Sequence, residues 1–506
     1  MTETERGSER RLDLLFAVAL FAAAFALRFL AARALAGEPV WDGHYYDFGA
    51  RRIAEGHGYS DDRVVAGNVE WHPWCHYPVG YSAFLAAFYR VLGTHAWALH
   101  LANALTGALV AVVAWLLGRE ALTKRRARLA GALVAIHPGL VLYGALVMGE
   151  VLAALTVMVA FWLAVRGSAV VRQPSRSTRL RGVAAGALML GVGALVRPQA
   201  LLCAPFLALA LPLAPPPATL VRRWLPRLGA AALACVLALV PVLPWTARNC
   251  RVMDGCALVS TNAGWNLAIG SFPRATGRFE TLRSSDGCRE VTGQVQQDRC
   301  WFEYGLANIK ATPRRWLGLV PAKLSNTFDH ESFAVEYLRE ARPADWPEPR
   351  RVAWREVLTT VHRLLIVASP LAFVALILRR RIDRRAQAMQ GALLGGVLLA
   401  AYFAIAADSP TFWPIAVATC VVAWLPVPGR PRSPPALLLL VVLLATTALT
   451  HAVFFGDDRY HMVVTPALCL LAAAALRPSA GPRTDSPNAR GADTDGVRAA
   501  EQAQAS

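Results

Sequence analysis

Residues 12–36, LDLLFAVALFAAAFALRFLAARALA, form an apolar segment interrupted only by one aspartate and two arginines. About 20 such residues in a helix cross the roughly 30 Å hydrocarbon core of a bilayer. The chain is 55% hydrophobic and 17% charged, which is too apolar for a soluble protein of 506 residues. Similar segments lie near 96–118, 128–147, 150–165, 182–196, 199–213, 228–246, 357–378, 387–406, 411–426, 435–455 and 462–476. We therefore expect an all-α polytopic membrane protein with about 12 transmembrane helices.

The arginines between the apolar segments predict the orientation of the chain. With residues 1–11 in the cytoplasm, every second connection also faces the cytoplasm, where Lys and Arg are enriched. All of these connections are basic: 119–128, 166–181, 222–227, 379–385 and 428–434. Two long connections, 37–95 and 247–356, then form large extracytoplasmic loops on one side. The first segment lacks a nearby small-residue cleavage motif, so we interpret it as a retained span.

These clusters also account for the formal net charge of +18. No basic region with interleaved aromatic residues lies outside the apolar segments, so we expect no nucleic-acid partner. The expected organisation is a cytoplasmic N-tail, a transmembrane core with the first outer loop, an extracytoplasmic subdomain, C-terminal transmembrane helices and a disordered cytoplasmic tail. The corresponding residues are 1–11, 12–246 with 37–95, 247–356, 357–476 and 477–506.

The two outer loops carry helical patterns. In the first, YYDFGARRIAEG predicts an amphipathic helix that ends at Gly56 or Gly58, and residues 78–93 predict a second helix in the membrane interface. The alternative is that both helices are surface connectors. In the second loop, residues 296–330 predict two amphipathic helices broken at Pro313. The arginines after this proline either follow lipid headgroups or anchor the loop.

Ionisable residues near the apolar segments are few, and each is costly in a membrane. Arg28 lies inside the first segment, Glu150 and Arg197 lie at outer turns, and Asp408 and GDDRYH at 456–461 lie at the outer ends of later segments. Apart from Arg28, these charges collect at one membrane surface. Together with Asp42 they predict a shared cavity, the alternative being ordinary turn and interface residues.

Several motifs carry a resemblance to a known family. They are Asp42-Gly43-His44-Tyr45-Tyr46, Gly56-His57-Gly58-Tyr59, HYPVGYSAFLAAFYRVLG, HPGLVLYGALVMGEVL, LVRPQALL, the region 244–277 and GDDRYHMVVTP. In this order, over about residues 10–475, the chain resembles the GT-C type integral-membrane glycosyltransferases, in the branch of bacterial protein mannosyltransferases and the lipid A aminoarabinose transferase.

The resemblance implies transfer of a sugar, with inversion, from a polyprenyl-phosphate donor to an acceptor hydroxyl. Asp42 matches the catalytic acid of the family, and a carboxylate is suited to removing the acceptor proton. Arginines stabilise the departing phosphate, and the candidates are Arg248 and Arg459, with Arg197 as a weaker one. Further substrate-binding candidates are Tyr46, His76, Tyr77, Glu150, Asn249 and Tyr460.

The chain departs from the family at two places. Gly43 stands where an acid usually follows the catalytic aspartate, and His76-Tyr77-Pro78 stands where some relatives have an acid-lysine pair before the proline. A second carboxylate or a metal ligand is therefore in doubt. His72, Cys75 and His76 have ligand types that suit a divalent metal such as zinc, but their spacing belongs to no standard site. The other interpretation is that His44 or His76 lines the site as a polar residue.

Nine cysteines divide by location. Four fall in apolar segments, where a buried thiol behaves as a small hydrophobe. The outer ones lie in a compartment that is oxidising in a bacterial periplasm. Short loops make Cys250 with Cys256, and Cys288 with Cys300, the natural pairs, which leaves Cys75 over; other pairings are open.

Three functional classes fit these observations. The first is a membrane glycosyltransferase (hexosyl or pentosyl) at the outer face of a bacterial inner membrane, with both termini cytoplasmic; its partners are the lipid-phosphate donor, membrane lipid and a protein or glycan acceptor. The second is a transporter or lipid flippase, although no internal repeat or mid-span ionic pair favours it. The third is an inactive family member that acts as a partner subunit, which Gly43 motivates.

Overall fold

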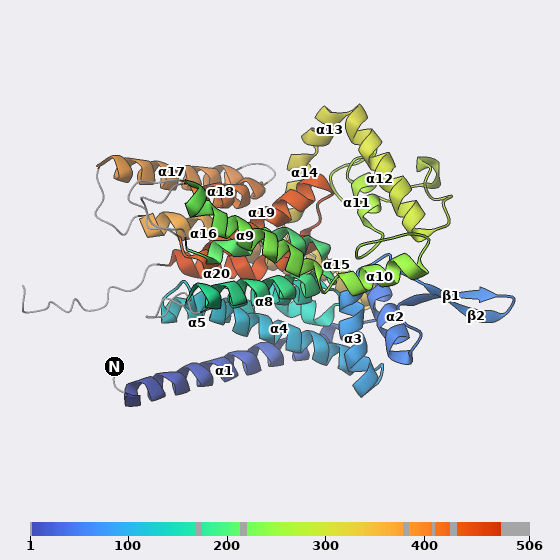
Figure 1. Ribbon diagram of the computed structural model, residues 1–506, viewed down its shortest axis with the longest axis horizontal. Coiled ribbons are helices and arrows are strands. Elements are labelled where there is room, and N and C mark those ends of the chain that lie inside the picture. Colours follow the sequence, from blue (N-terminus) through green and yellow to red (C-terminus); the bar gives the residue numbers. More distant parts are fainter. Residues whose placement is uncertain are drawn as a thin grey trace, which may run out of the picture. The chain divides into compact units, whose positions relative to one another are not determined.

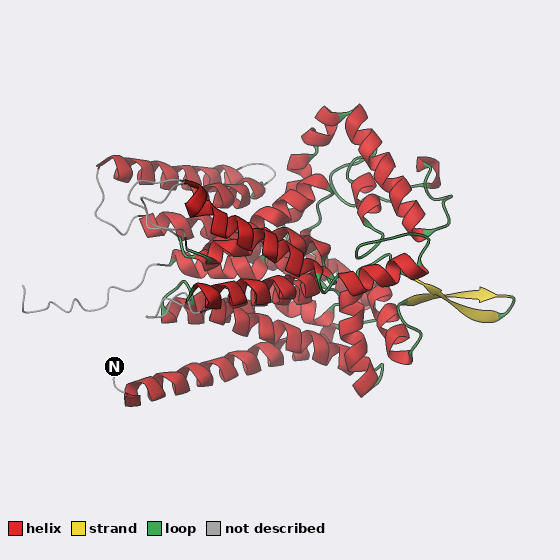
Figure 2. Ribbon diagram, viewed as in Figure 1, coloured by secondary structure: helices red, strands yellow, loops and turns green. Residues whose placement is uncertain are grey.

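The computed structural model describes residues 3–166, 175–212, 220–377, 384–406, 410–425 and 433–476. The described chain is almost entirely helical, and its only sheet is an antiparallel hairpin in which Ser60 pairs with Pro73 (Figure 2). The elements in chain order are α1 (Glu3–Leu35), α2 (Asp42–Glu55), β1 (Ser60–Val65), β2 (Asn68–Pro73), α3 (Val79–Leu92), α4 (Ala96–Arg119), α5 (Lys124–Ile136), α6 (Pro138–Leu142), η1 (Tyr143–Ala145), α7 (Glu150–Val165), α8 (Arg176–Ala194), η2 (Pro198–Ala210), α9 (Leu220–Leu239), α10 (Leu243–Val252), α11 (Ala263–Ile269), η3 (Ser284–Asp286), α12 (Gln294–Ala311), α13 (Pro313–Gly318), α14 (Val320–Phe328), α15 (Phe333–Ala341), η4 (Pro343–Asp345), α16 (Glu348–Ile377), α17 (Arg384–Ala406), α18 (Trp413–Trp424), α19 (Pro435–Val453), η5 (Asp458–Val463) and α20 (Thr465–Ala475).

Five helices are long and apolar enough to cross a membrane, and two bent helix pairs raise this number to seven. The five are α1, α4, α16, α17 and α19. The bent pairs are α5 with the segment 138–145, at 51°, and α9 with α10, at 45°. The prediction of an all-α polytopic membrane protein is confirmed. The count of about 12 stays a prediction, because α7, η2, α18 and α20 are shorter apolar helices of 10–17 residues.

Small residues allow the helices to pack closely. α7 lies against α8, where a Cβ on Gly182 or Gly186 would fall 2.6 Å from the carbonyl oxygens of Leu163 and Ala160. Such contacts are typical of membrane helices, because the association of apolar helices in lipid relies on close packing. The buried core is built from Ala, Val, Leu and Phe side chains across α4, α5, α7, α19 and α20.

Arg28 lies in the C-terminal part of α1 and is 1% exposed. Its guanidinium donates hydrogen bonds to the carbonyl oxygens of Val134 and Ala135, both at 2.8 Å, and of Ala24 at 3.1 Å. Val134 and Ala135 lie in the last turn of α5, which ends before Pro138, so these carbonyls lack the usual partner four residues later. Arg28 therefore caps the C-terminal end of α5 by satisfying these carbonyl groups.

The outer loops gather at one end of the helices. Figure 1 shows α2, α3, the β1–β2 hairpin and α10–α13 at the end of the bundle away from the start of α1. The grouping of residues 37–95 and 247–356 on one side agrees with the sequence prediction. α2 ends at Gly56 with φ 95°, which confirms the first helix prediction. The predicted break at Pro313 is present, because α12 ends two residues before it, but the segment after the break forms two helices, α13 and α14, instead of one. The hairpin was not predicted.

Two further sets of predictions concern the arginines after Pro313 and the residues that the structure does not describe. Arg315 donates hydrogen bonds to the carbonyl oxygens of Phe272, Pro273 and Ala275, at 2.8–3.1 Å, which favours the anchoring role for this arginine. Asp408 and the tail 477–506 lie outside the described residues.

Replacing Arg28 with leucine should destabilise the protein. The change leaves buried carbonyls at the end of α5 without partners, and each costs about 1–3 kcal/mol. We expect a lower midpoint of thermal unfolding in detergent for Arg28→Leu, and little change for Arg33→Leu, which removes an exposed arginine from the same helix. Equal midpoints for Arg28→Leu and the parent protein would contradict the capping role.

Candidate active site

A cavity of about 520 Å³ lies among the outer segments. Its walls come from four regions that are distant in sequence: the first outer loop, residues 197–202, residues 258–289 of the second outer loop, and residues 450–460. The predicted residues that line it are Asp42, Tyr46, His76, Tyr77, Arg197, Arg459 and Tyr460. Of the outer charges predicted to share a cavity with Asp42, Arg197 and Arg459 do so, whereas Glu150 is not among the lining residues.

Asp42 is the first residue of α2, and its side chain is 21% exposed. Tyr77 donates its hydroxyl proton to Oδ1 at 2.7 Å, and Arg459 donates to Oδ2 at 2.5 Å. Burial raises the pKa of Asp42, but the charge of Arg459 and the hydrogen bond from Tyr77 outweigh it and hold the pKa below the ordinary value. The helix N-terminus also favours negative charge. Asp42 is thus an ionised acceptor at neutral pH.

Arg459 is held by its own short helix, η5. Asp457 precedes this helix and accepts a hydrogen bond from the backbone amide of Arg459 at 3.1 Å. The carboxylate of Asp458 accepts from the backbone amides of Ser332 and Phe333, which begin α15. The guanidinium of Arg459 lies 4.8 Å from the Tyr460 ring centre and donates to its hydroxyl at 3.0 Å. These contacts fix the cation beside Asp42.

Asp457 is a second carboxylate beside Arg459. Burial raises its pKa to about 7; the charge of Arg459 opposes this rise, while Asp458 and Asp42 add to it. Asp457 therefore changes its charge near neutral pH. The sequence analysis included it only as part of GDDRYH, because its environment depends on segments that meet only in the fold.

Gly43 is closely packed. A Cβ at this position would collide with the hydroxyl of Tyr337 and lie 3.0 Å from the carbonyl oxygen of Val147. The acid that usually follows the catalytic aspartate in the family has no room here. The departure seen in the sequence is therefore part of the packing of α2 against α15 and the segment before α7.

Arg197 and Glu150 form an ion pair. Glu150 is fully buried at the start of α7, whereas Arg197 is 14% exposed and lines the cavity. The Arg197 guanidinium lies 5.3 Å from the centre of the Tyr460 ring. Glu150 thus holds Arg197, which lines the cavity. Glu150 itself is not a lining residue.

Arg248 and Asn249, both in α10, lie outside the cavity lining. Arg248 donates to the backbone carbonyls of Tyr59 at 2.7 Å and Trp74 at 3.1 Å, so it joins the two outer loops. Asn249 is buried and donates to the carbonyl of Ala257 at 3.1 Å. Their proposed contact with a donor phosphate has no geometric support, because their polar atoms are engaged with the protein backbone.

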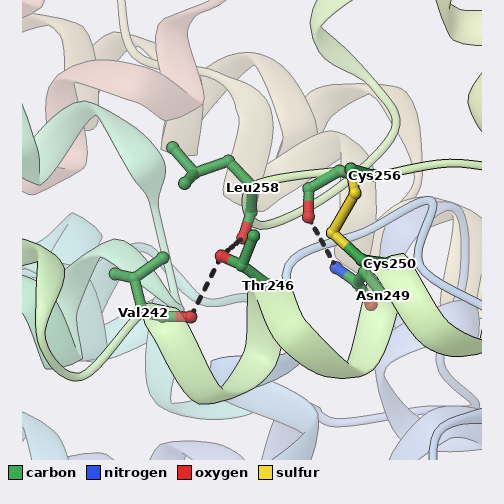
Figure 3. Close-up of a disulfide and its surroundings, with 7 residues drawn as sticks. Val242, Thr246, Asn249, Cys250, Cys256 and Leu258 are labelled. Atoms are coloured by element: carbon green, nitrogen blue, oxygen red, sulfur yellow. Dashed lines mark hydrogen bonds between the residues drawn. A yellow bond between two sulfur atoms is a disulfide. The ribbon is translucent and has the colours of Figure 1, made fainter.

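Both predicted disulfides, Cys250–Cys256 and Cys288–Cys300, are formed. Figure 3 shows the first at the end of α10, where Thr246 also donates to the carbonyl of Leu258 at 2.7 Å. Cys75 is a buried free thiol, as expected. The first disulfide closes a turn directly before the segment that lines the cavity.

The sequence analysis did not single out several cavity residues individually. The segment STNAGWN, residues 260–266, supplies Ser260, Asn262, Trp265 and Asn266. Its run of polar and aromatic residues soon after an apolar segment was a usable signal. His76 meets the edge of the Trp265 ring at 5.8 Å between ring centres, and burial lowers the pKa of His76. The interpretation of His76 as a neutral polar wall residue agrees with this position.

The predicted metal ligands in the first loop are dispersed. His72 lies on β2 near Glu70, at 3.7 Å, Cys75 contacts Thr261 at 3.9 Å, and His76 faces the cavity. A different group, Glu331, His362 and His461, is the only one in the described part of the chain whose ligand atoms all lie within 4.8 Å of one another. The two interpretations of the first-loop histidines are thus separated for His76, whose position agrees with a polar residue that lines the site.

Comparison with known proteins gives one family match and several distant structures. Residues 76–245 match the family described as dolichyl-phosphate-mannose-protein mannosyltransferase. No curated protein matches. Among solved structures, the oligosaccharyltransferase of Archaeoglobus fulgidus, tethered to an acceptor peptide, is 13% identical with a TM-score of 0.45; the match covers 92% of this chain and 49% of the other. This chain thus spans about half the length of that enzyme.

A second structure is ArnT from Cupriavidus metallidurans bound to undecaprenyl phosphate. It is 16% identical with a TM-score of 0.36, and the match covers 90% of this chain and 77% of ArnT. The family match spans Tyr77, Glu150 and Arg197, and it supports the resemblance of this chain to the GT-C type integral-membrane glycosyltransferases.

Proposed function

We propose that the protein is an inverting glycosyltransferase that moves a sugar from a polyprenyl-phosphate donor to an acceptor hydroxyl. The observation that carries this proposal is the Asp42 carboxylate, held between Tyr77 and Arg459 in the wall of the 520 Å³ cavity. The family description names a dolichyl-phosphate-linked mannose, which supports a lipid-phosphate donor. We propose a protein or envelope glycan as the acceptor, at the outer face of a bacterial inner membrane.

Asp42 is the proposed general base. As the bond to the acceptor oxygen forms at the anomeric carbon, Asp42 accepts the hydroxyl proton of the acceptor, and the sugar passes through an oxocarbenium-like state. The bond between the sugar and the donor phosphate breaks on the opposite face, which inverts the configuration. Arg459 and Arg197, both in the cavity wall, stabilise the negative charge on the departing phosphate.

Donor binding and base strength are coupled in this arrangement. Arg459 donates to Asp42, and a donor phosphate competes for the same guanidinium. When the phosphate takes part of this contact, the charge effect that lowers the pKa of Asp42 weakens. Asp42 then becomes a stronger base only when a donor is present, which limits proton transfer to the productive complex.

Replacing Asp42 with asparagine tests the catalytic role. Asparagine keeps the shape but cannot accept the proton, and loss of a general base lowers rates by about 10²–10⁴-fold. We expect transfer of radiolabelled sugar from lipid donor to fall by this factor while donor binding persists. Glu55→Gln, at the exposed end of the same helix, is the matched control. Unchanged transfer in Asp42→Asn would refute the proposal, and donor binding without transfer in the parent would favour a partner subunit.

Asp457 predicts a pH dependence of donor binding. Because its pKa is raised to about 7, Asp457 is neutral below this pH and negative above it. The added charge beside Arg459 opposes an anionic donor, whose phosphodiester keeps its charge throughout this range. We expect the donor KM to rise roughly tenfold, or about 1.4 kcal/mol, from pH 6 to pH 8. In Asp457→Asn the rise should disappear; a parent KM that stays constant contradicts this assignment.

A further inference from the structure

A buried polar cluster lies apart from the cavity lining. Glu331 follows α14, His362 lies in α16 and His461 lies in η5, so three distant segments meet here. Their residues are 2%, 0% and 0% exposed. The His362 and His461 rings are stacked with centres 3.7 Å apart. A carboxylate and two imidazoles at this depth need partners, since buried polar groups without them are costly.

Backbone contacts fix the tautomers of both rings. Nε2 of His362 lies 2.9 Å from the carbonyl oxygen of Phe328, and Nδ1 of His461 lies 2.7 Å from that of Thr327. A carbonyl oxygen only accepts, so each of these nitrogens carries the proton. The opposite nitrogens, Nδ1 of His362 and Nε2 of His461, then present lone pairs when the rings are neutral. A histidine whose other nitrogen donates to a backbone carbonyl is the usual form of a metal ligand.

The free lone pairs and the carboxylate face the same space. Nε2 of His461 lies 3.4 Å from Oε2 of Glu331. In the described chain, Nδ1 of His362 and Oε1 of Glu331 have no hydrogen-bond partner. A proton on His461 satisfies only its contact with Glu331 and leaves these two atoms unmatched. A cation at the centre satisfies all three side chains.

His137 does not extend the ligand set. Its Nδ1 accepts a hydrogen bond from the amide of Leu140 at 3.3 Å, so Nε2 carries the proton in the neutral ring. A protonated nitrogen is not a metal ligand. Gly139 lies directly against Oε1 of Glu331, where any Cβ would collide with it. The carboxylate is therefore closely confined.

We propose that Glu331, His362 and His461 bind one divalent transition-metal ion, with zinc as the best fit. Two imidazoles and a carboxylate suit zinc, whereas magnesium and calcium prefer oxygen ligands. Ligand atoms about 2.1 Å from zinc are roughly 3.4 Å apart in a tetrahedral site. The three atoms lie within 4.8 Å of one another, so binding requires their separations to shorten by at most about 1.4 Å.

The metal has a structural role. None of its three ligands is among the residues that line the cavity, but His461 is two positions from Arg459 in the same short helix. Tying η5 to α16 and to the start of α15 fixes the backbone that carries this arginine. The inference does not depend on the proposed glycosyl transfer.

Metal analysis of the purified full-length chain tests the site. The protein is purified with a tag free of histidine, stripped with a chelator, reloaded with zinc or cobalt(II) and freed of excess metal. We expect about one ion per chain by mass spectrometry, and visible absorption of bound cobalt. His362→Gln should lose the ion, whereas His330→Gln, beside Glu331 in sequence, should keep it.

X-ray absorption of the zinc-loaded parent protein decides the case even where a variant fails to fold. Nitrogen and oxygen ligands with the outer-shell signals of two imidazoles support the site. A sulfur ligand would place the ion at a cysteine, away from the proposed cluster, and overturn the proposal. Parent protein that retains no zinc or cobalt after loading also overturns it, and the cluster is then a protonated His461–Glu331 pair.

Discussion

The ion pair between Asp42 and Arg459 joins residues 417 positions apart and closes the outer end of the helices. A charge that is mostly removed from water must be matched by an opposite charge or by several hydrogen bonds. Asp42 has both, because Tyr77 occupies its second oxygen. The first outer loop and η5 are therefore held together by the group that the proposed chemistry uses, and the cavity forms where they meet.

The same constraint explains the other polar residues of the bundle. Arg28 closes the carbonyls of a broken helix, Glu150 holds Arg197, and Asp458 accepts the first amides of α15. Each was conspicuous in the sequence because ionisable residues are rare beside apolar segments. Their roles differ, however: of these residues only Arg197 lines the cavity. Arg28 and Asp458 bind backbone groups, and Glu150 pairs with the Arg197 side chain. The rarity of ionisable residues beside apolar segments thus identifies structurally or functionally important positions. It does not tell residues that hold the fold together from residues that line the cavity.

The sequence predicted the helical class, the side shared by both outer loops, two disulfides and seven of the residues that line the cavity. These depend on local patterns and motif order. Arg248 illustrates what the sequence does not determine: its motif suggested a phosphate ligand, yet its guanidinium meets the carbonyls of Tyr59 and Trp74. The hairpin at 60–73 and the meeting of Glu331 with His461 likewise depend on contacts between distant segments. Contacts between distant segments leave no periodic pattern of residues in the sequence from which they could be predicted.

Although position 43 carries no acid, Asp42 is not the only carboxylate near Arg459. Asp457 supplies a second carboxylate from the other end of the chain, and its raised pKa leaves it neutral below about pH 7. Asp42 and Glu150 then balance Arg459 and Arg197. In the proposed reaction, Asp42 gains a proton while the departing phosphate gains a negative charge. Protonation neutralises the Asp42 carboxylate, which until then competes with the phosphate for Arg459. The Arg459 guanidinium therefore pairs with the base before transfer and stabilises the leaving phosphate after it.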